Sequence, residues 1–251
     1  MRIMHYDAGD GPRYGEVVDG TVHEWEGDLF GPRRRTGRTH AAAKLRVLAP
    51  VVPSKFILAS LNYEEVVTQL GYPRPKSPIL FLKAPSAIVA DGEAIRYPAV
   101  SKYVTFEPEL VVVIGRTCRR VPKERAMEYV LGYTCTNDVS ARDIQEAEVQ
   151  YTRCKSFDTF GPLGPAIVTD IDPSDLAVAG DLNGERRIAT RTSNLIFDIP
   201  TLISFASDCM TLEPGDLIST GASGVAEMKV GDTVTIEIEK LGRLENRVAP
   251  W

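Results

Sequence analysis

Short apolar runs separated by polar turns dominate the first part of the chain. Residues 1–49 contain four such runs: Arg2 to Tyr6, Tyr14 to Val18, Thr21 to Trp25 and Leu45 to Ala49. Asp19-Gly20 lies between the second and the third and is a strong two-residue hairpin signal. Because prolines follow at positions 50 and 53, we predict a small N-terminal β domain over residues 1–50.

Residues 51–251 alternate longer apolar runs with short helical patterns. Ile79 to Leu82 and Leu110 to Gly115 predict buried strands. Thr233 to Glu239 alternates apolar and polar positions, as a half-buried strand does. Short helices are predicted over residues 62–70, with Asn62 as its cap, over 122–129 and over 200–208. The pattern predicts an α+β, β-dominated fold with one large mixed domain over residues 51–251.

Composition and charge narrow the class of protein. With 43% hydrophobic and 25% charged residues, the chain has the composition of a globular protein. Its net charge of −5 disfavours nucleic acid as a partner. We interpret the one basic run, Arg33-Arg34-Arg35 with Arg38, as a solvated loop. No stretch approaches a membrane span and the first residues have no apolar signal core, so we expect a cytoplasmic protein without a membrane partner.

Histidine and cysteine are poorly placed for catalysis or for zinc. The three histidines are His5, His23 and His40, and the four cysteines form no C-x-x-C pair. A His/Cys zinc site therefore has no suitable ligand spacing, and a disulfide scaffold is equally unsupported. Any chemistry beyond position 40 has to proceed without imidazole.

Glu107-Pro108-Glu109 stands immediately before the apolar run that begins at Leu110. Side chains alternate along an extended chain, so Glu107 and Glu109 point to the same side and need a cation between or beside them. Pro108 places the pair at a strand start or edge. The alternative is an exposed acidic edge that discourages aggregation.

A second polar cluster follows the apolar segment that ends at Cys135. It runs from Thr136 to Asp143 and offers Asp138 as an oxygen ligand and Arg142 as a carboxylate clamp. Residues in this cluster are equally suited to capping the helix that follows. Lys155 begins the next polar loop and is the candidate cation, with a surface lysine as the alternative.

These segments together resemble the fumarylacetoacetate hydrolase family. The resemblance covers roughly residues 55–248 in unchanged order. The motifs that carry it are Leu61-Asn62-Tyr63, Phe81 to Ile88, Glu107-x-Glu109-Leu110, Val113-Ile114-Gly115, Asn137 to Asp143, Lys155 to Asp158, Gly161 to Pro165, Asn183-Gly184-Glu185, Pro214-Gly215-Asp216 and Thr220-Gly221.

The resemblance implies a metal centre. Glu107, Glu109 and Asp138 correspond to the family's three carboxylate ligands for Mg²⁺ or Mn²⁺. An all-oxygen ligand set suits such a hard cation. In the family, the metal binds the oxo-acid end of a small substrate and polarises its carbonyl, which stabilises an enolate.

The same resemblance assigns the groups around the metal. Lys155 corresponds to the active-site lysine, and Arg142 and Gln145 to positions that hold substrate oxyanions in some members. Thr220 and Gly221 correspond to a substrate-side loop. The resemblance also implies a mixed β-sandwich or β-roll fold and a homodimer.

The sequence departs from the family pattern where protons are handled. Many members place a His and, three residues later, a Glu in the helix after Asn-Tyr, whereas Val66 and Gln69 occupy these positions here. Valine and glutamine cannot serve as the usual acid–base pair. Glu64 or Glu65 would be the nearest substitutes, but neighbouring helix residues point in different directions. The Thr220 to Val225 loop also lacks one residue of the usual pattern.

We therefore predict a Mg²⁺- or Mn²⁺-dependent enzyme that acts on an enolisable 2-oxo or 1,3-dicarbonyl carboxylate. Decarboxylation and keto–enol isomerisation need only enolate stabilisation, so they tolerate the loss of the acid–base pair better than hydrolysis does. Hydrolytic carbon–carbon cleavage of an acylpyruvate is the alternative reaction. A protein that binds an oxo-acid without turnover is the alternative class.

Overall fold

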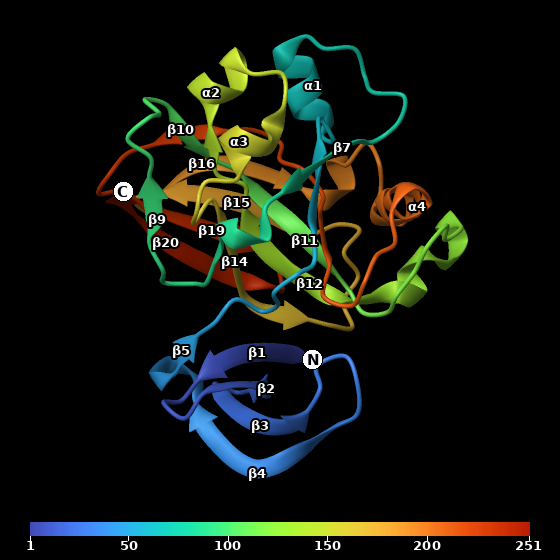
Figure 1. The fold of residues 1–251 in the computed structure, drawn as a ribbon, viewed down its shortest axis with the longest axis vertical. Coiled ribbons are helices and arrows are strands. Elements are labelled where there is room, and N and C mark those ends of the chain that lie inside the picture. Colours follow the sequence, from blue (N-terminus) through green and yellow to red (C-terminus); the bar gives the residue numbers. More distant parts are fainter.

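The computed structural model describes all 251 residues, as a small N-terminal unit joined to a larger body (Figure 1). Asp19 and Gly20 have φ values of 47° and 74° and connect two paired strands, which confirms the predicted hairpin. The strands of the N-terminal unit, blue in Figure 1, are β1 (Arg2–Asp7), β2 (Pro12–Val18), β3 (Thr21–Gly27), β4 (Arg33–Ala41) and β5 (Arg46–Val47).

One sheet of 12 strands runs through both parts. Ten strands follow the order β4-β3-β2-β1-β14-β12-β11-β17-β6-β7, while β5 pairs with β1 and β8 pairs with β14. The junction is between β1 and β14, where Arg2 lies opposite Val168 and Ile3 opposite Ile167. The strands of this sheet in the larger body are β6 (Phe56–Ser60), β7 (Ile79–Lys83), β8 (Ile88–Val89), β11 (Pro108–Ile114), β12 (Val130–Asn137), β14 (Gly161–Val168) and β17 (Leu217–Ser219).

Two smaller sheets complete the larger body, in the orders β16-β15-β19-β20-β9 and β13-β10-β18. Strands β15 and β19 lie against β11 and β12. The protein therefore has the predicted β-dominated α+β fold, with sheets packed face to face and a small β domain at its N-terminus. The additional strands are β9 (Ile95–Tyr97), β10 (Val104–Phe106), β13 (Ser140–Ala141), β15 (Ala177–Leu182), β16 (Glu185–Arg191), β18 (Ala226–Met228), β19 (Thr233–Ile238) and β20 (Gly242–Pro250).

The helices are short. Helices α1, α2 and α3 gather at the end of the larger body that is opposite the N-terminal unit (Figure 1). The Asp198 carboxylate caps α4 by accepting the Thr201 N–H at 3.0 Å. No helix combines the length and the apolar character that crossing a membrane requires. The α-helices are α1 (Glu64–Leu70), α2 (Arg142–Ala147), α3 (Tyr151–Lys155) and α4 (Ile199–Cys209), and the 3₁₀ helices are η1 (Ala42–Lys44), η2 (Pro85–Ala87), η3 (Lys123–Tyr129) and η4 (Thr192–Asn194).

Strand β11 is buried along its whole length because both of its faces are apolar. Leu110 and Val112 pack in the larger core, between the sheets, whereas Val111 and Val113 pack in a smaller core on the other side. The prediction of a buried strand here is confirmed, and Pro108 is the first residue of the strand, as predicted. This rigid central strand begins at the acidic pair.

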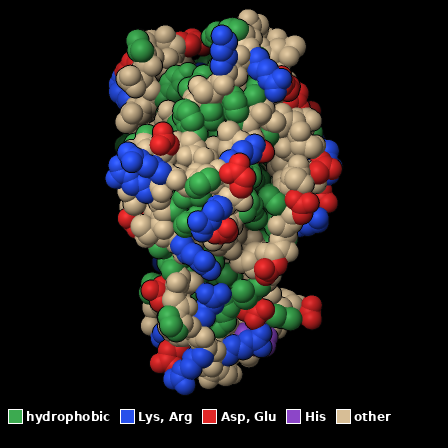
Figure 2. Space-filling view, turned by 90° about the vertical axis from the view of Figure 1, so that its right-hand side faces the viewer, with side chains coloured by type: hydrophobic (Ala, Val, Ile, Leu, Met, Phe, Trp, Pro, Cys, Tyr) green, Lys and Arg blue, Asp and Glu red, His purple; other side chains and the backbone are tan.

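The basic run of the N-terminal unit is a strand, so the predicted loop was wrong, although Arg34, Arg35 and Arg38 are solvent-exposed as predicted. The run lies in β4, where Arg33 stacks over the Trp25 ring with 4.5 Å between its Cζ atom and the ring centroid. Arg34 pairs with Glu26 at 2.6 Å. Pairing with β3, the preceding strand, gives these arginines their partners. On the face in Figure 2, basic and acidic side chains are interspersed.

Three local predictions also need correction. Asn62 does not cap α1, because its side chain bonds the backbone of Phe197 and Thr220 instead. The helix predicted over 122–129 is the 3₁₀ helix η3. Strand β7 is only partly buried, because it lies at the end of the sheet.

Candidate functional site

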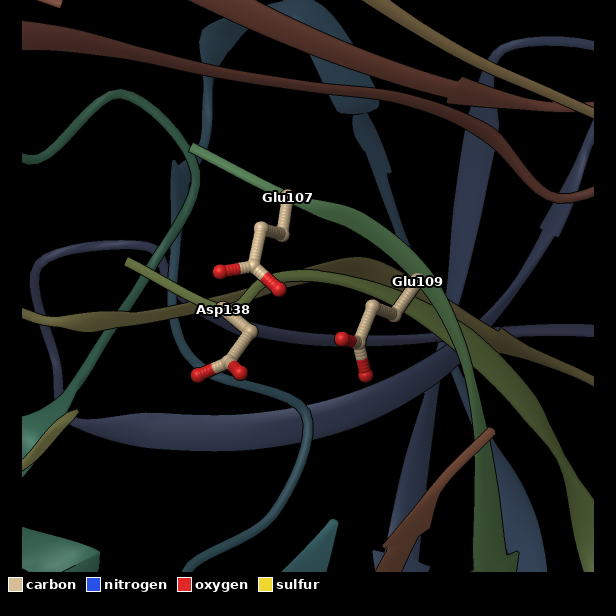
Figure 3. A group of neighbouring side chains, drawn as sticks. All are labelled: Glu107, Glu109 and Asp138. Carbon is tan, nitrogen blue, oxygen red and sulfur yellow. The ribbon is translucent and has the colours of Figure 1, made fainter. Parts of the chain in front are cut away.

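Three buried carboxylates converge at one end of β11. One oxygen atom from each of Glu107, Glu109 and Asp138 lies within 4.8 Å of the other two. Figure 3 shows the three side chains pointing toward one another, Glu107 and Glu109 from one strand and Asp138 from beyond the end of its neighbour. None of the three is more than 7% exposed. The alternative of an exposed acidic edge is therefore excluded by their burial.

The pairing of β11 with β12 positions this group. Pro108 lies opposite Asn137, so Glu107 and Asp138 become neighbours just beyond the paired residues. The Asp138 N–H donates to the Glu107 carbonyl at 2.9 Å, and the Glu107 N–H donates to the Asn137 side-chain oxygen at 3.0 Å. These bonds hold the turn after β12, and the side chains of Asn137 and Asp138 do not cap α2.

Each of the two glutamates accepts hydrogen bonds from the protein through only one of its carboxylate oxygens. Glu107 Oε1 accepts from Ser140 at 2.8 Å and from Arg142 at 2.6 Å. Glu109 Oε2 accepts from the Ser219 hydroxyl and from the Gly221 N–H. Glu107 Oε2 and Glu109 Oε1 have no protein donor. Burial, reinforced by the Asp138 and Glu107 carboxylates, raises the pKa of Glu109 well above its ordinary value.

Two buried lysines contact Asp138. Lys83 Nζ lies 2.8 Å from Oδ1, and Lys155 Nζ donates to Oδ2 and, at 3.2 Å, to Glu107. Burial favours the neutral form of Asp138, but the two lysines outweigh it and lower the pKa of Asp138. Burial acts to lower the pKa of Lys155, but the Asp138 and Glu107 carboxylates outweigh it and raise that pKa. Lys155 is therefore an ammonium cation and a hydrogen-bond donor.

Arg142, the first residue of α2, is held in a fixed orientation. Its Nε donates to Thr105 at 3.0 Å, its Nη1 to the Gln145 side-chain oxygen at 2.9 Å and its Nη2 to Glu107. A guanidinium has five N–H donors, so two remain for a ligand. The Gln145 amide nitrogen also has no protein partner.

The cluster formed by Glu107, Glu109 and Asp138 fits a hard divalent cation. It supplies three oxygen ligands without histidine or cysteine, and two of the glutamate oxygens are not engaged by the protein. A carboxylate oxygen that accepts a hydrogen bond has a second lone pair, so the lysines do not block Asp138 as a ligand. Nearby lysine and arginine cations reduce the repulsion among the three carboxylates.

Comparisons with known proteins decide the family. Residues 55–249 match the family model described as "Fumarylacetoacetate (FAA) hydrolase C-terminal". The chain belongs to the fumarylacetoacetate hydrolase family. Residues 1–50 match a separate model described as "Rv2993c-like, N-terminal".

Relatives within the fumarylacetoacetate hydrolase family cover nearly the whole chain. An uncharacterized protein of Archaeoglobus fulgidus is 49% identical over 232 residues, or 92% of this chain and 93% of that protein. The structure of 5-carboxymethyl-2-hydroxymuconate delta-isomerase from Mycobacterium smegmatis has a TM-score of 0.93 at 42% identity and covers 100% of both chains. The structure of 2-hydroxyhepta-2,4-diene-1,7-dioate isomerase from Mycobacterium marinum has a TM-score of 0.92 at 41% identity, covering 100% of this chain and 98% of that one.

In this member of the fumarylacetoacetate hydrolase family, the carboxylates open into a cavity of about 780 Å³. Val66 and Gln69 of α1 line the cavity, so the two positions that depart from the family pattern lie at the site. Glu64 pairs with Arg74 at 2.9 Å, and Glu65 accepts from Asn194 at 2.6 Å. Neither glutamate lines the cavity, so neither replaces the missing pair.

The loop predicted to contact substrate, at Thr220 and Gly221, contacts strand β11 and the Glu109 carboxylate. Thr220 is fully buried and bonds the Leu110 carbonyl, and neither Thr220 nor Gly221 is among the cavity-lining residues. Ala222, Gly224 and Val225 of the same loop do line the cavity. Substrate contacts by Thr220 and Gly221 stay a prediction.

Replacing Gly221 by alanine is expected to weaken Mn²⁺ binding about tenfold, as loss of a supporting contact to a ligand does. Gly221 has a φ of 91°, and an added Cβ would lie 2.8 Å from the Ala59 carbonyl oxygen, so the N–H that holds Glu109 must move. Calorimetric titration with Mn²⁺ measures the effect. Gly184→Ala is the matched control, because Gly184 also has positive φ but a Cβ there meets nothing within 4 Å. Equal affinity in both variants would contradict this role.

Several residues at the site were not predicted as functional. Lys83 is 1% exposed and its Nζ contacts Asp138, Val139 and Phe160. Its place within the family motif from Phe81 to Ile88 was an available indication. Glu146 and Glu148, which also line the cavity, had no sequence signal that separated them from surface acids.

Proposed function

We propose that this protein is a Mg²⁺- or Mn²⁺-dependent enzyme that catalyses keto–enol isomerisation or decarboxylation of a small 2-oxo or 1,3-dicarbonyl carboxylate. The observation that supports it is the buried group of Glu107, Glu109 and Asp138, next to Lys155, in a cavity where Val66 and Gln69 occupy the positions of the usual acid–base pair. The two isomerases with similar structures point to the same type of chemistry. The proposal includes a cytoplasmic homodimer.

Different residues of the site would bind the metal, stabilise negative charge and orient the substrate. Glu107, Glu109 and Asp138 would hold the metal, which supplies electrophilic polarisation of the substrate carbonyl. Lys155 donates a hydrogen bond from its ammonium to negative charge that develops on the substrate oxygen. Arg142 offers its two remaining N–H groups to the substrate carboxylate, a geometry that favours one orientation.

Deuterium exchange tests the proposed reaction. An enolising enzyme exchanges the C3 protons of a 2-oxo acid with D₂O, which NMR follows directly. We expect exchange that requires Mg²⁺ or Mn²⁺ and falls at least about 100-fold in Lys155→Met, the range lost with one oxyanion-stabilising donor. Oxygen-18 from water in a cleaved acylpyruvate product would show hydrolysis instead. Metal-dependent oxalate binding without exchange or cleavage across a panel of oxo-acids would indicate a binding protein.

Restoring the family's acid–base pair is expected to add hydrolysis. In Val66→His with Gln69→Glu, an imidazole and a carboxylate face the cavity, where they can activate water. Acylpyruvate hydrolysis should rise by about tenfold or more, since general-base catalysis contributes about 10²–10⁴-fold. Thr68→His is the control, because Thr68 is exposed on the same helix and does not line the cavity. No gain in hydrolysis would mean that the pocket differs from the family pattern at more positions than Val66 and Gln69.

A further inference from the structure

The cavity has two chemically different ends. One end holds Glu107, Glu109 and Asp138 with their cations (Figure 3). Much of the remaining wall is apolar, and includes the side chains of Val66, Leu70, Tyr72, Val149 and Val225. These come from α1, from the segment that follows it, from the α2–α3 connection and from the loop before β18. Apolar side chains from separate parts of the chain thus contribute to one wall.

The cavity contains no cation for a second carboxylate. Arg142 and Lys155 are the only lysine or arginine residues that line it, and both contact the metal-site carboxylates. The other charged residues in the wall are Glu146 and Glu148, which repel an anion. Arg153 pairs with Glu148 but does not itself line the cavity. A dicarboxylate bound at the metal would therefore place its far carboxylate near two acids and exposed apolar side chains, with no lysine or arginine of the wall free to pair with it.

We propose that this cavity selects 2-oxo carboxylates whose far end is an uncharged, apolar group, and that it discriminates against dicarboxylates. The inference rests on the proposed function, since the metal end has to hold the oxo-acid group. It separates this chain from the M. marinum relative, whose name specifies a dioate. Apolar tails gain from contact with the wall, by about threefold in affinity for each methylene that is largely buried.

Calorimetry with three ligands in the presence of Mn²⁺ tests the proposal. Oxalate occupies only the metal end, whereas 2-oxohexanoate and 2-oxohexanedioate share a six-carbon chain and differ in the charge at its far end. We expect 2-oxohexanoate to bind at least about tenfold more tightly than the dioate. If oxalate binds and the dioate binds equally or more tightly, the selectivity is wrong. If oxalate shows no metal-dependent binding, the proposed function itself fails. The oxalate result therefore tests the metal site independently of the selectivity.

A charge placed in the apolar wall provides the matched variant. Val149 is 94% exposed at the cavity, so Val149→Lys should fold normally. It should reduce the preference for 2-oxohexanoate at least about threefold by offering the dioate a partner. Val52→Lys, at a residue 84% exposed outside the cavity, adds the same charge elsewhere and should leave the preference unchanged. Equal effects of the two variants, or no effect of Val149→Lys, would overturn the proposal.

Discussion

Replacing Lys83 by methionine is expected to lower the free energy of unfolding by about 3 kcal/mol, because one partner of a buried ion pair is removed. Methionine has nearly the same length, so little volume is lost. The change leaves the Phe160 and Val139 carbonyls without the Lys83 donor and leaves only Lys155 beside Asp138. Urea denaturation followed by circular dichroism measures the loss.

Two further variants separate this structural role from a general effect of charge. Lys102 is exposed, and Lys102→Met should change stability by less than about 0.5 kcal/mol. Lys155 contacts the same carboxylate but borders the cavity, where water can replace the ammonium, so Lys155→Met should cost clearly less stability than Lys83→Met. A loss in Lys83→Met no larger than that in Lys155→Met would show that Lys83 is not a main support of the site.

Replacing Glu109 by glutamine is expected to abolish metal binding while stabilising the metal-free protein. Loss of an outer contact typically costs about 10–100-fold in metal affinity, so loss of a direct carboxylate ligand should cost at least about 100-fold. Ser219 and Gly221 can still donate to the glutamine oxygen, so the fold is preserved. Mn²⁺ titration and thermal denaturation in the presence of a chelator give the two readouts. Unchanged Mn²⁺ affinity would remove Glu109 from the site.

The stability gain follows from the direction of the pKa shift. The folded protein raises the pKa of Glu109, so it binds this proton more tightly than the unfolded chain does. Stability from this residue is therefore complete below the ordinary glutamate pKa and decreases as the pH rises through the raised value. Glutamine cannot ionise, and this part of the pH dependence should disappear in the variant. Glu64→Gln, at an exposed position, should leave it unchanged.

The sequence predicted those features that follow from local rules. Glu107 and Glu109 are two residues apart on an extended chain, so alternation alone places both carboxylates on one side. Leu110 to Ile114 is apolar at every position, which identified a strand buried on both faces. Asp138 joins the group only through the pairing of β11 with β12, and the family motifs indicated it where periodicity did not.

The features that were missed depend on tertiary contacts or strand pairing. Lys83 is buried because Asp138 and Phe160 meet it, 55 and 77 residues further along the chain. Arg33 and its neighbours are in a strand because β3 supplies an aromatic ring and acidic partners. Asn62 follows a capping pattern, but a tertiary contact with Phe197 takes its side chain away from the helix. For Lys83 and Asn62 a partner remote in sequence outweighed the local preference, and for the arginines it was pairing with the preceding strand.

The β1–β14 junction has a consequence for how the chain folds. Ile3 and Leu29 of the N-terminal unit share the smaller core with Leu163 and Ile167 of β14, so this core contains residues from both parts. Without residues 1–50, β14 would expose hydrogen-bonding groups and apolar side chains at a sheet edge, a condition that promotes aggregation. The two sequence modules should therefore unfold together in a single cooperative transition, as one thermodynamic unit.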